Sequence, residues 1–413
     1  MKPLEGIRVL SFVNALAGPV ATFLLGDLGA EVVDVEEPSG RGRRGTADRP
    51  PLPGVPDRPW NRVSGETRRS KLSVTIDVAH SEGRETFLRL AAVCDVMIEN
   101  FSPRVLQKLR VDYDELVKVN PDIILVSMSA FGKSGPYRDR TSYGPGIDAM
   151  SGLSHLTGYP DGGPGKPGPV LNDYNSGVLA VVAALAALRH RNRTGKGQYI
   201  EISMIEAEVH LLGEALLAMQ FGREEPERLG NRHPVLAPHN VYACAGDDRW
   251  IAIACRTDAE FAALAEAIGR PDLLTDARFA TMLARKHHED DLDREIGRWT
   301  AEQEHLRAQD FLQSRGIAAG AVLDMKEVVE SPQFIARGLF EEAWNPEVGA
   351  VPHIRGPWKF GGTPAPVDRP APGFGEHNDY VLRDLLGLSE AEVAGLEDLG
   401  VVARVPLGVK APA

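Results

Sequence analysis

One acidic side chain stands out because a long apolar run follows it almost directly. Asp173 lies in the polar stretch "NDYNSG" (172–177), just before the apolar run from Val178 to Leu188. A carboxylate with an ordinary pKa is ionised at neutral pH, so it can attack an acyl group without a partner base. The positive end of a helix stabilises such an anion, and nearby backbone N–H groups can stabilise the oxyanion that forms after attack.

The same stretch has a plainer interpretation as the start of a helix. Asn, Asp and Ser are favoured at helix N-caps, where the side chain accepts a backbone N–H from the first turn. Asp173 and its neighbours Asn172, Asn175 and Ser176 are all of these types. The residues alone therefore leave two hypotheses open for Asp173, a nucleophile and a helix cap.

Groups that suit a phosphorylated, anionic ligand recur near the ends of predicted strands. "RRSK" (68–71) precedes a strand, "ENFSP" (99–103) follows one, and Lys108 lies on the next helix. Each alone is typical of surface charge or a helix cap, but their shared position favours one anion site. The formal net charge is −12, so an anionic ligand must be held by such local groups. Non-specific binding of nucleic acid is not expected.

Several other classes of site lack their sequence markers. The first turn, "VNALAGPVA", carries one glycine rather than G-x-G-x-x-G, which disfavours NAD or FAD although Glu36 and Glu37 end the next strand. The histidines show no ligand spacing, and "KHHEDD" (286–291) is typical of a solvated helix start, so no metal is expected. No G-x-S-x-G follows a strand, which disfavours Ser–His–Asp chemistry.

The elements that must position these residues alternate between strand and helix. Strands separated by single helices predict an α/β fold with a mostly parallel, Rossmann-like sheet. The expected strands are 7–13, 30–36, 71–78 and 95–101, one within "NPDIILVSMSAFG" (120–132) and one at "GQYIEISM" (197–204). The expected helices between the first four include 18–29 and 81–94.

The chain of 413 residues is too long for one compact core, so two domains are expected. We expect a large α/β domain starting with 1–220, a linker at 221–234 and a small α+β domain at 235–325. Residues 326–413 are expected to return to the large domain as a connection and C-terminal helices. The absence of a secretory signal, of an apolar run of bilayer length and of CxxC spacing predicts a cytoplasmic protein without membrane contact. Its cysteines, Cys94, Cys244 and Cys255, lie in apolar contexts typical of a core.

An ordered series of stretches runs along almost the whole chain. It includes "LAGPVATFLLGDLGAEVVDVEEP", "SKLSVTIDV", "CDVMIENFSPRVLQKLRVDYDEL", "NPDIILVSMSAFGKSGPY" and "NDYNSGVLAVVAALAALRHRNRTGKGQYIEISM". In these the chain resembles the class III coenzyme A transferases, the family of formyl-CoA transferase and carnitine CoA-transferase. The resemblance implies a two-domain α/β fold whose chains form rings, two of which interlock as a homodimer. It implies acyl-CoA and carboxylic acid substrates, with no permanently bound cofactor and no metal.

The resemblance also implies a role for Asp173. The family's nucleophile is an aspartate in a D-x-x-x-G context, here Asp173 with Gly177, which becomes an aspartyl–acyl anhydride and then an aspartyl-CoA thioester. α-Methylacyl-CoA racemases of the same fold carry a His-Asp pair where this chain has Tyr143 and Gly144. Neither residue is a good acid or base at neutral pH, which favours CoA transfer. An acyl-CoA racemase or isomerase and a CoA-thioester-binding protein without turnover remain alternatives.

The residues expected to contact CoA follow from the same resemblance. Ala17 matches the family's loop after the first strand, and Lys71 matches the lysine before "SVTIDV". Lys108 stands where relatives often have Arg, which keeps the charge but loses a bidentate fork. Formyl-CoA transferases have His and Gln at the positions of Asn14 and Leu16, so oxalate and formate are not favoured substrates. The full set expected at the CoA site is Asn14, Leu16, Ala17, Arg41, Lys71, Asn100, Phe101, Lys108 and Tyr143.

Overall fold

The computed structural model describes residues 2–40, 65–168, 170–222, 226–345, 349–363, 366–367 and 369–407. The chain divides into two compact units. The first, called the large unit, consists of Met1–Leu153, Lys166–Leu217 and Ala336–Ala413. The second, called the small unit, consists of Ser154–Gly165 and Ala218–Ile335.

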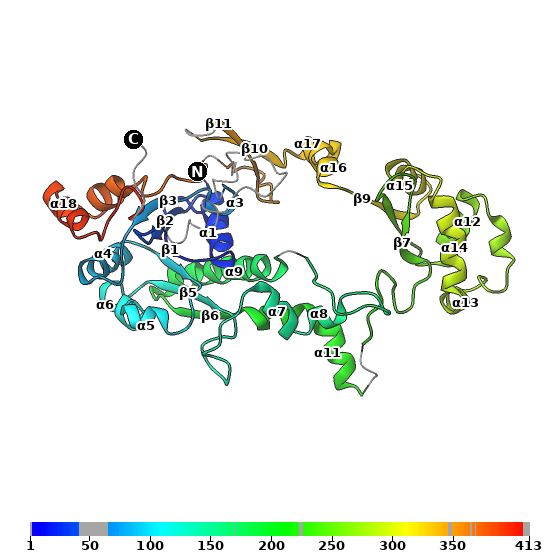
Figure 1. Ribbon diagram of the computed structural model, residues 1–413, viewed down its shortest axis with the longest axis horizontal. Helices are drawn as coiled ribbons and strands as arrows, with labels where there is room; N and C mark the ends of the chain where they lie inside the picture. Colours follow the sequence, from blue (N-terminus) through cyan, green and yellow to red (C-terminus); the bar gives the residue numbers. More distant parts are fainter. Residues whose placement is uncertain are drawn as a thin grey trace. The chain divides into compact units, whose positions relative to one another are not determined.

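The large unit is built on a six-stranded sheet in which all neighbouring strands are parallel. The strand order β3-β2-β1-β4-β5-β6 places β1 near the middle, so the chain winds outward from β1 in both directions. This confirms the predicted α/β class and the parallel sheet (Figure 1). The strands are β1 (Arg8–Phe12), β2 (Glu31–Glu36), β3 (Leu72–Thr75), β4 (Val96–Glu99), β5 (Ile124–Ser129) and β6 (Tyr199–Ser203).

Helices cover both faces of this sheet, and successive strand residues point to opposite faces. Leu10 belongs to the core under α4, α5, α6 and the C-terminal helices, whereas Val9 belongs to the core under α1 and α9. Because both faces of the inner strands are buried, their polar side chains, such as Ser11, Asp34 and Glu99, are buried together with the apolar ones. The covering helices are α1 (Ala17–Asp27), α4 (Ser81–Ala92), α5 (Val105–Leu109), α6 (Tyr113–Val119), α9 (Leu171–Thr194), the π-helix η4 (Tyr380–Leu385) and α18 (Glu390–Asp398).

Helix α9 differs from the expectation that no apolar segment has bilayer length. By its length of 24 residues and its composition it is long and apolar enough to cross a membrane. Its Ala180, Ala184 and Ala187 are nevertheless fully buried in the core formed with α1 and the sheet. Core helices of soluble proteins also reach this length and composition, so α9 is described here as a core helix of the large unit.

The remaining elements of the chain's middle and end are short. They include α3 (Gly65–Arg68), α7 (Gly144–Met150), α8 (Leu153–Leu156), α10 (Met204–Val209), η2 (His210–Leu212), α11 (Gly213–Gln220), α17 (Pro332–Arg337) and the antiparallel pair β10 (Phe340–Asn345) and β11 (Gly349–Ile354). The sequence patterns did not indicate α6, α7 or the β10–β11 pair. Elements of six or seven residues show too little periodicity to be recognised from sequence.

The small unit has a three-stranded antiparallel sheet, whose first two strands form a hairpin across "GDD" (246–248). The side chains of Ile251 and Ile253 point into a core shared with Phe261, Leu292 and Leu312 of the covering helices. Its elements are β7 (His239–Ala243), β8 (Trp250–Ala254), α12 (Asp258–Ala267), η3 (Pro271–Leu274), α13 (Met282–His287), α14 (Glu289–Thr300), α15 (His305–Gln313), β9 (Ala318–Val322) and α16 (Met325–Glu330).

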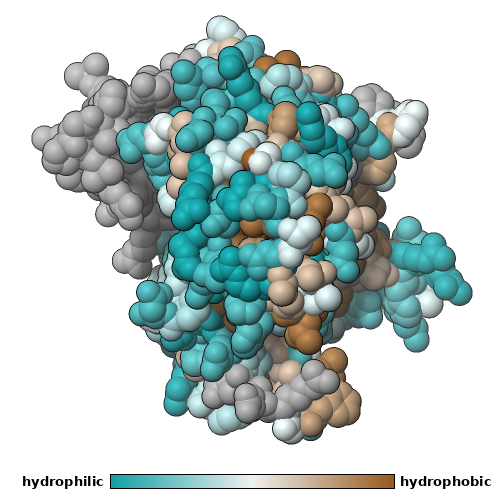
Figure 2. Space-filling view, turned by 90° about the vertical axis from the view of Figure 1, so that its right-hand side faces the viewer, coloured by the Kyte–Doolittle hydropathy of each residue, from teal (hydrophilic) through white to brown (hydrophobic). Residues whose placement is uncertain are grey.

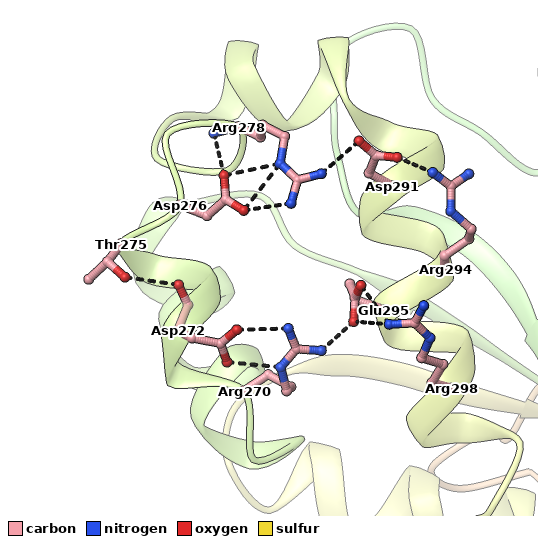
Figure 3. Close-up of polar contacts among 9 residues, drawn as sticks. All are labelled: Arg270, Asp272, Thr275, Asp276, Arg278, Asp291, Arg294, Glu295 and Arg298. Atoms are coloured by element: carbon pink, nitrogen blue, oxygen red, sulfur yellow. Dashed lines mark hydrogen bonds and ion pairs between the residues drawn. The ribbon is translucent and has the colours of Figure 1, made fainter.

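A network of ion pairs joins the segment around η3 to α14 (Figure 3). Arg270 forms two hydrogen bonds with Asp272, of 2.8 and 2.7 Å, and also contacts Glu295 on α14. Arg278 likewise pairs with its neighbour Asp276 and reaches Asp291 on α14 at 2.9 Å. Single exposed ion pairs contribute little to stability, but the bidentate geometry and the shared network hold the segment around η3 against α14. The face of the molecule shown in Figure 2 is mainly hydrophilic, which agrees with many exposed charged side chains.

Close packing of α1 on α9 generates the first prediction. A Cβ at Gly177 would lie 2.7 Å from Val20 Cγ1 and 2.9 Å from the Ala17 carbonyl oxygen. Gly177→Ala is therefore expected to separate α1 from α9 and to lower the free energy of unfolding by about 1–3 kcal/mol in urea titrations. The control is Gly395→Ala in α18, where a Cβ has nothing within 4 Å. Helix propensity should make this control stabilising. A Gly177→Ala protein as stable as the wild type would contradict the prediction.

Candidate functional site

Asp173 is held by another helix rather than by its own. Helix α9 begins at Leu171 with Val170 as its N-cap, so Asp173 lies in the first turn and is not the cap. Its carboxylate accepts the backbone N–H of Ala17, the first residue of α1. The interpretation of Asp173 as the N-cap of its own helix is therefore wrong. The N–H groups at a helix start lack intrahelical partners, so α1 has a donor to offer.

The loop that leads from β1 to Ala17 is braced by Asn100. The Asn14 N–H donates to Asn100 Oδ1, and Asn100 Nδ2 donates to the Asn14 carbonyl, both at 2.7 Å. Between them Ala15 has a positive φ of 54°, which is uncommon for a residue with a Cβ and persists only when its surroundings hold it. Its N–H donates to Asn14 Oδ1 at 2.7 Å. Asn100, expected as a CoA contact, thus has its amide engaged in shaping this loop.

The backbone of Gly144 also lies close to the Asp173 carboxylate. Gly144 is the first residue of α7, and a Cβ there would lie 2.8 Å from Asp173 Oδ2. Any larger residue would displace the carboxylate or occupy the space in front of it. Tyr143, the N-cap of α7, is 76% exposed. The position that carries Asp in racemases therefore has no side chain to act as a second acid or base.

The environment of Asp173 makes its charge less stable than in water. Burial raises the pKa of the carboxyl, and the negative charge of Asp148 raises it further. The Ala17 N–H and the positive charge of Lys166 oppose this rise, but the net direction is upward. A carboxylate whose charge is incompletely stabilised is more basic, and basicity increases the nucleophilicity of an oxygen.

A cleft of about 540 Å³ opens at the carboxyl edge of the sheet. This edge, beside the strand at which the winding direction reverses, is where open α/β sheets bind their ligands. The walls of the cleft include Asn14 and Ala15 after β1, Asp34 and Glu36 from β2, Glu37 directly after it, Arg68, Lys71 and Phe101. The structure therefore brings together three of the residues expected at the CoA site: Asn14, Lys71 and Phe101.

Lys71 is the buried cation of this cleft. It is 2% exposed, and burial lowers the pKa of its ammonium group to about 8, although the charges of Asp34 and Glu36 act in the opposite direction. Those two carboxylates also pair with Arg68, at 3.4 and 2.6 Å. Burying a charged lysine costs free energy unless an anion pairs with it. A buried lysine with a lowered pKa in a cleft is therefore typical of a site that binds an anionic ligand.

The other expected contacts are more dispersed. Leu16 is the N-cap of α1, and Phe101 packs against Phe12 with ring centroids 4.7 Å apart. Lys108 is exposed on α5, although its neighbour Leu109 lines the cleft. Arg41 lies outside the described residues. Sequence reasoning did not single out Asp148 or Lys166, and the only signal for Asp148 was an acid within the apolar context "GIDAM".

The family model described as "CoA-transferase family III" matches residues 4–378. The chain belongs to this family. Among curated relatives, the succinyl-CoA–D-citramalate CoA-transferase of Chloroflexus aurantiacus is 36% identical, over 97% of this chain and 98% of that protein. The succinyl-CoA:glutarate CoA-transferase of Mus musculus is 31% identical over 98% and 91%. The chain is thus an enzyme of the CoA-transferase class.

Solved structures agree with this assignment. A CaiB/BaiF family protein from Brucella suis is 33% identical and superposes with a TM-score of 0.83 over 93% of this chain and 99% of that chain. The Mycobacterium tuberculosis protein Rv3272 is 30% identical, with a TM-score of 0.77 over 92% and 98%. The fold described above is therefore that of the CaiB/BaiF proteins.

Lys71 provides a prediction that combines stability and binding. Below about pH 8 the folded state keeps a buried charge, so Lys71→Met should raise the free energy of unfolding at pH 7 by on the order of 2 kcal/mol. Between about pH 8 and 10.5 only the unfolded state still binds this proton. The stabilisation by the variant should therefore shrink in that range. The same variant should bind CoA about tenfold more weakly in calorimetry at pH 7.

The control is Lys118→Met on α6, where the lysine side chain is 63% exposed. It should change neither CoA affinity nor the pH dependence of unfolding. If Lys71→Met binds CoA as tightly as the wild type, Lys71 does not contact CoA and the prediction is wrong.

Proposed function

We propose that this chain transfers coenzyme A from an acyl-CoA donor to a carboxylic acid acceptor, with the Asp173 carboxylate as covalent carrier. The observation that carries the proposal is that this carboxylate contacts the Ala17 N–H and lies close to the backbone of Gly144. The loop that lines the cleft at Asn14 and Ala15 ends at Ala17. This one loop therefore connects the wall of the cleft, where CoA would bind, to the residue that contacts the nucleophile.

In the first half-reaction an oxygen of Asp173 attacks the carbonyl carbon of the donor thioester. The negative charge moves to the carbonyl oxygen, where backbone N–H groups at the start of α1 are suited to stabilise it. CoA leaves as thiolate with the electron pair of the C–S bond, which yields an aspartyl–acyl anhydride. The thiolate then attacks the aspartyl carbonyl, releases the donor acid as carboxylate and leaves an aspartyl-CoA thioester.

The second half-reaction reverses these steps with the acceptor. The acceptor carboxylate attacks the aspartyl-CoA thioester, which gives a new anhydride and free thiolate. The thiolate attacks the acyl carbon of the acceptor, and Asp173 returns as carboxylate. Every step exchanges one activated acyl bond for another and consumes no proton. The residues need only stabilise an oxyanion and hold the thiolate near the carboxyl group.

For the substrates we propose succinyl-CoA as donor and a dicarboxylic acid as acceptor. Relatives from Chloroflexus aurantiacus and Mus musculus are named for succinyl-CoA with citramalate, glutarate or malate. The positive charge of Lys166 acts on Asp173 and suits the second carboxylate of such a substrate. Acyl-CoA racemisation is disfavoured because Gly144 offers no second acid or base beside Asp173.

The proposal is tested by trapping the intermediate. Wild-type protein incubated with succinyl-CoA should gain the mass of a CoA thioester, located on Asp173 by peptide mapping and released by hydroxylamine. Asp173→Ala should lose this adduct and reduce transfer to a panel of mono- and dicarboxylic acids by about 10³-fold or more. Asp114→Ala, which removes an exposed acid from the first turn of α6, is the matched control. Near-wild-type transfer by Asp173→Ala would refute the mechanism.

We further propose that two chains form the active homodimer, interlocked as the family resemblance implies. Support comes from an apolar stripe along α9, made of Tyr174, Val178, Val182 and Leu185. These side chains are 40%, 47%, 57% and 37% exposed and recur every three or four residues, so they share one face of the helix. Contiguous exposed apolar surface of this kind is typical of a protein–protein interface.

A charge placed in the stripe tests this proposal. Val182→Glu should shift the molar mass measured by light scattering from dimer toward monomer, because a buried unpaired carboxylate opposes association. The control is Leu283→Glu, at an isolated side chain that is 80% exposed on α13. An unchanged dimer in Val182→Glu, or a monomeric wild type, would contradict the proposed assembly.

A further inference from the structure

Two buried carboxyl groups lie close to the first turn of α9, which carries Asp173. Asp148 on α7 is 2% exposed, and Glu208 on α10 is fully buried. Their side chains are in hydrogen-bonding contact, and neither forms an ion pair with a cation among the residues that the structure describes. Within the described ranges, Asp148 Oδ1 and Glu208 Oε1 also have no hydrogen-bond donor. Two carboxyl groups in contact, each with an oxygen that has no donor, need one hydrogen between them to form a hydrogen bond.

The pair is connected to the nucleophile through one residue. Asn172, which precedes Asp173 in the chain, is fully buried. Its Nδ2 donates to Glu208 Oε2 at 3.2 Å and to the Met204 carbonyl at 3.1 Å. Ser151, at the end of α7, donates its hydroxyl to the Asp148 carbonyl at 3.1 Å and also lowers the pKa of Glu208. The pair, the first turn of α9 and the start of α10 therefore form one polar cluster inside the large unit.

A single proton satisfies this geometry. Two carboxylates in contact and out of water cannot both be charged without a large cost, so such pairs hold a proton between them. With that proton the two unpartnered oxygens form one hydrogen bond and the pair carries one negative charge. Burial and the contact with Asp148 raise the pKa of Glu208 to about 7.

We propose that Asp148 and Glu208 share one proton and act as positioning residues whose negative charge favours the neutral, covalent forms of Asp173. The inference rests on the function proposed above. Asp173 is negative as a carboxylate but neutral as an anhydride or thioester, since its charge leaves with the thiolate or the released acid. A fixed negative charge nearby destabilises only the carboxylate form. It therefore shifts the internal equilibrium toward aspartyl-CoA, and the pair itself gains or loses no proton in that step.

The charges around the pair define how this effect depends on pH. Asp173 and Asn172 face it from α9, Asp148 belongs to α7, and Lys166 in the loop before α9 opposes the negative charge at Asp173. On α10 itself Glu206 is exposed to solvent. As the pH rises through about 7, Glu208 loses its proton and the charge of the pair doubles. The fraction of enzyme present as aspartyl-CoA should therefore rise over the same range.

The experiment compares three variants with the wild type at saturating succinyl-CoA between pH 6 and 8.5. Glu208→Gln keeps the shape and permanently supplies the missing donor, so its ratio of aspartyl-CoA to free enzyme should be independent of pH. Glu208→Gln with Asp148→Asn removes all charge and should lower that ratio about tenfold, equivalent to one pKa unit at Asp173. Glu206→Gln, two residues away on the same helix, should follow the wild type. Intact-mass analysis after acid quench measures the ratio.

The outcomes separate this inference from the function on which it rests. No adduct on wild-type Asp173 would overturn the proposed function. If the adduct forms but the ratio of aspartyl-CoA to free enzyme in Glu208→Gln follows the wild-type pH curve, only the shared proton is refuted. If that ratio is unchanged in the uncharged double variant, the proposed shift of the equilibrium toward aspartyl-CoA is refuted. Should the double variant not fold, potentiometric titration decides, because wild type should release one more proton than Glu208→Gln across pH 6 to 8. Equal release would refute the shared proton.

Discussion

The hydrogen bond from the Ala17 N–H to the Asp173 carboxylate is the contact on which the site depends. It exists because α1 and α9 approach closely enough for their first turns to meet, and that approach requires the missing side chain of Gly177. Apolar residues on the inner faces of both helices hold them against the same side of the sheet. Burial of that core therefore positions a charged group with the precision that catalysis requires.

The site must hold negative charge within a chain whose formal net charge is −12. An anionic ligand and an anionic nucleophile must both be accommodated in a largely acidic protein. The backbone N–H of Ala17 at the start of α1 serves the nucleophile, while Lys71 and Arg68 lie on the wall of the cleft. The acidic neighbours of these groups, Asp34 and Glu36 in the cleft and Asp148 beneath Asp173, limit how strongly each anion is held. Moderate binding suits a carrier that must release its acyl group twice per turnover.

Much of the large unit was predictable because its strands are buried on both faces. Segments rich in Val, Ile and Leu, separated by helical patterns, indicated β1 to β6 and the helices α1 and α4, although the strands also carry buried Ser, Asp and Glu side chains. The short helices α6 and α7 were not indicated, although α7 contributes Gly144 and Asp148 to the site. Its place is determined by contacts with α9 and α10 rather than by its own sequence. Local patterns carry little information about an element that is held by its neighbours.

The sequence by itself determined the family, the α/β class and the presence of an ionisable carboxylate at the start of a long helix. It left open whether Asp173 caps that helix, because local statistics describe only how a side chain meets its own backbone. The tertiary structure decided that Val170 is the N-cap and that the donor to Asp173 comes from Ala17, far away in the chain. It also placed Glu208 on Asp148, which neither residue's neighbours in sequence indicate. Through-space contacts arise from the packing of whole elements, so hydrogen-bond partners and shifted pKa values appear only once the fold has formed.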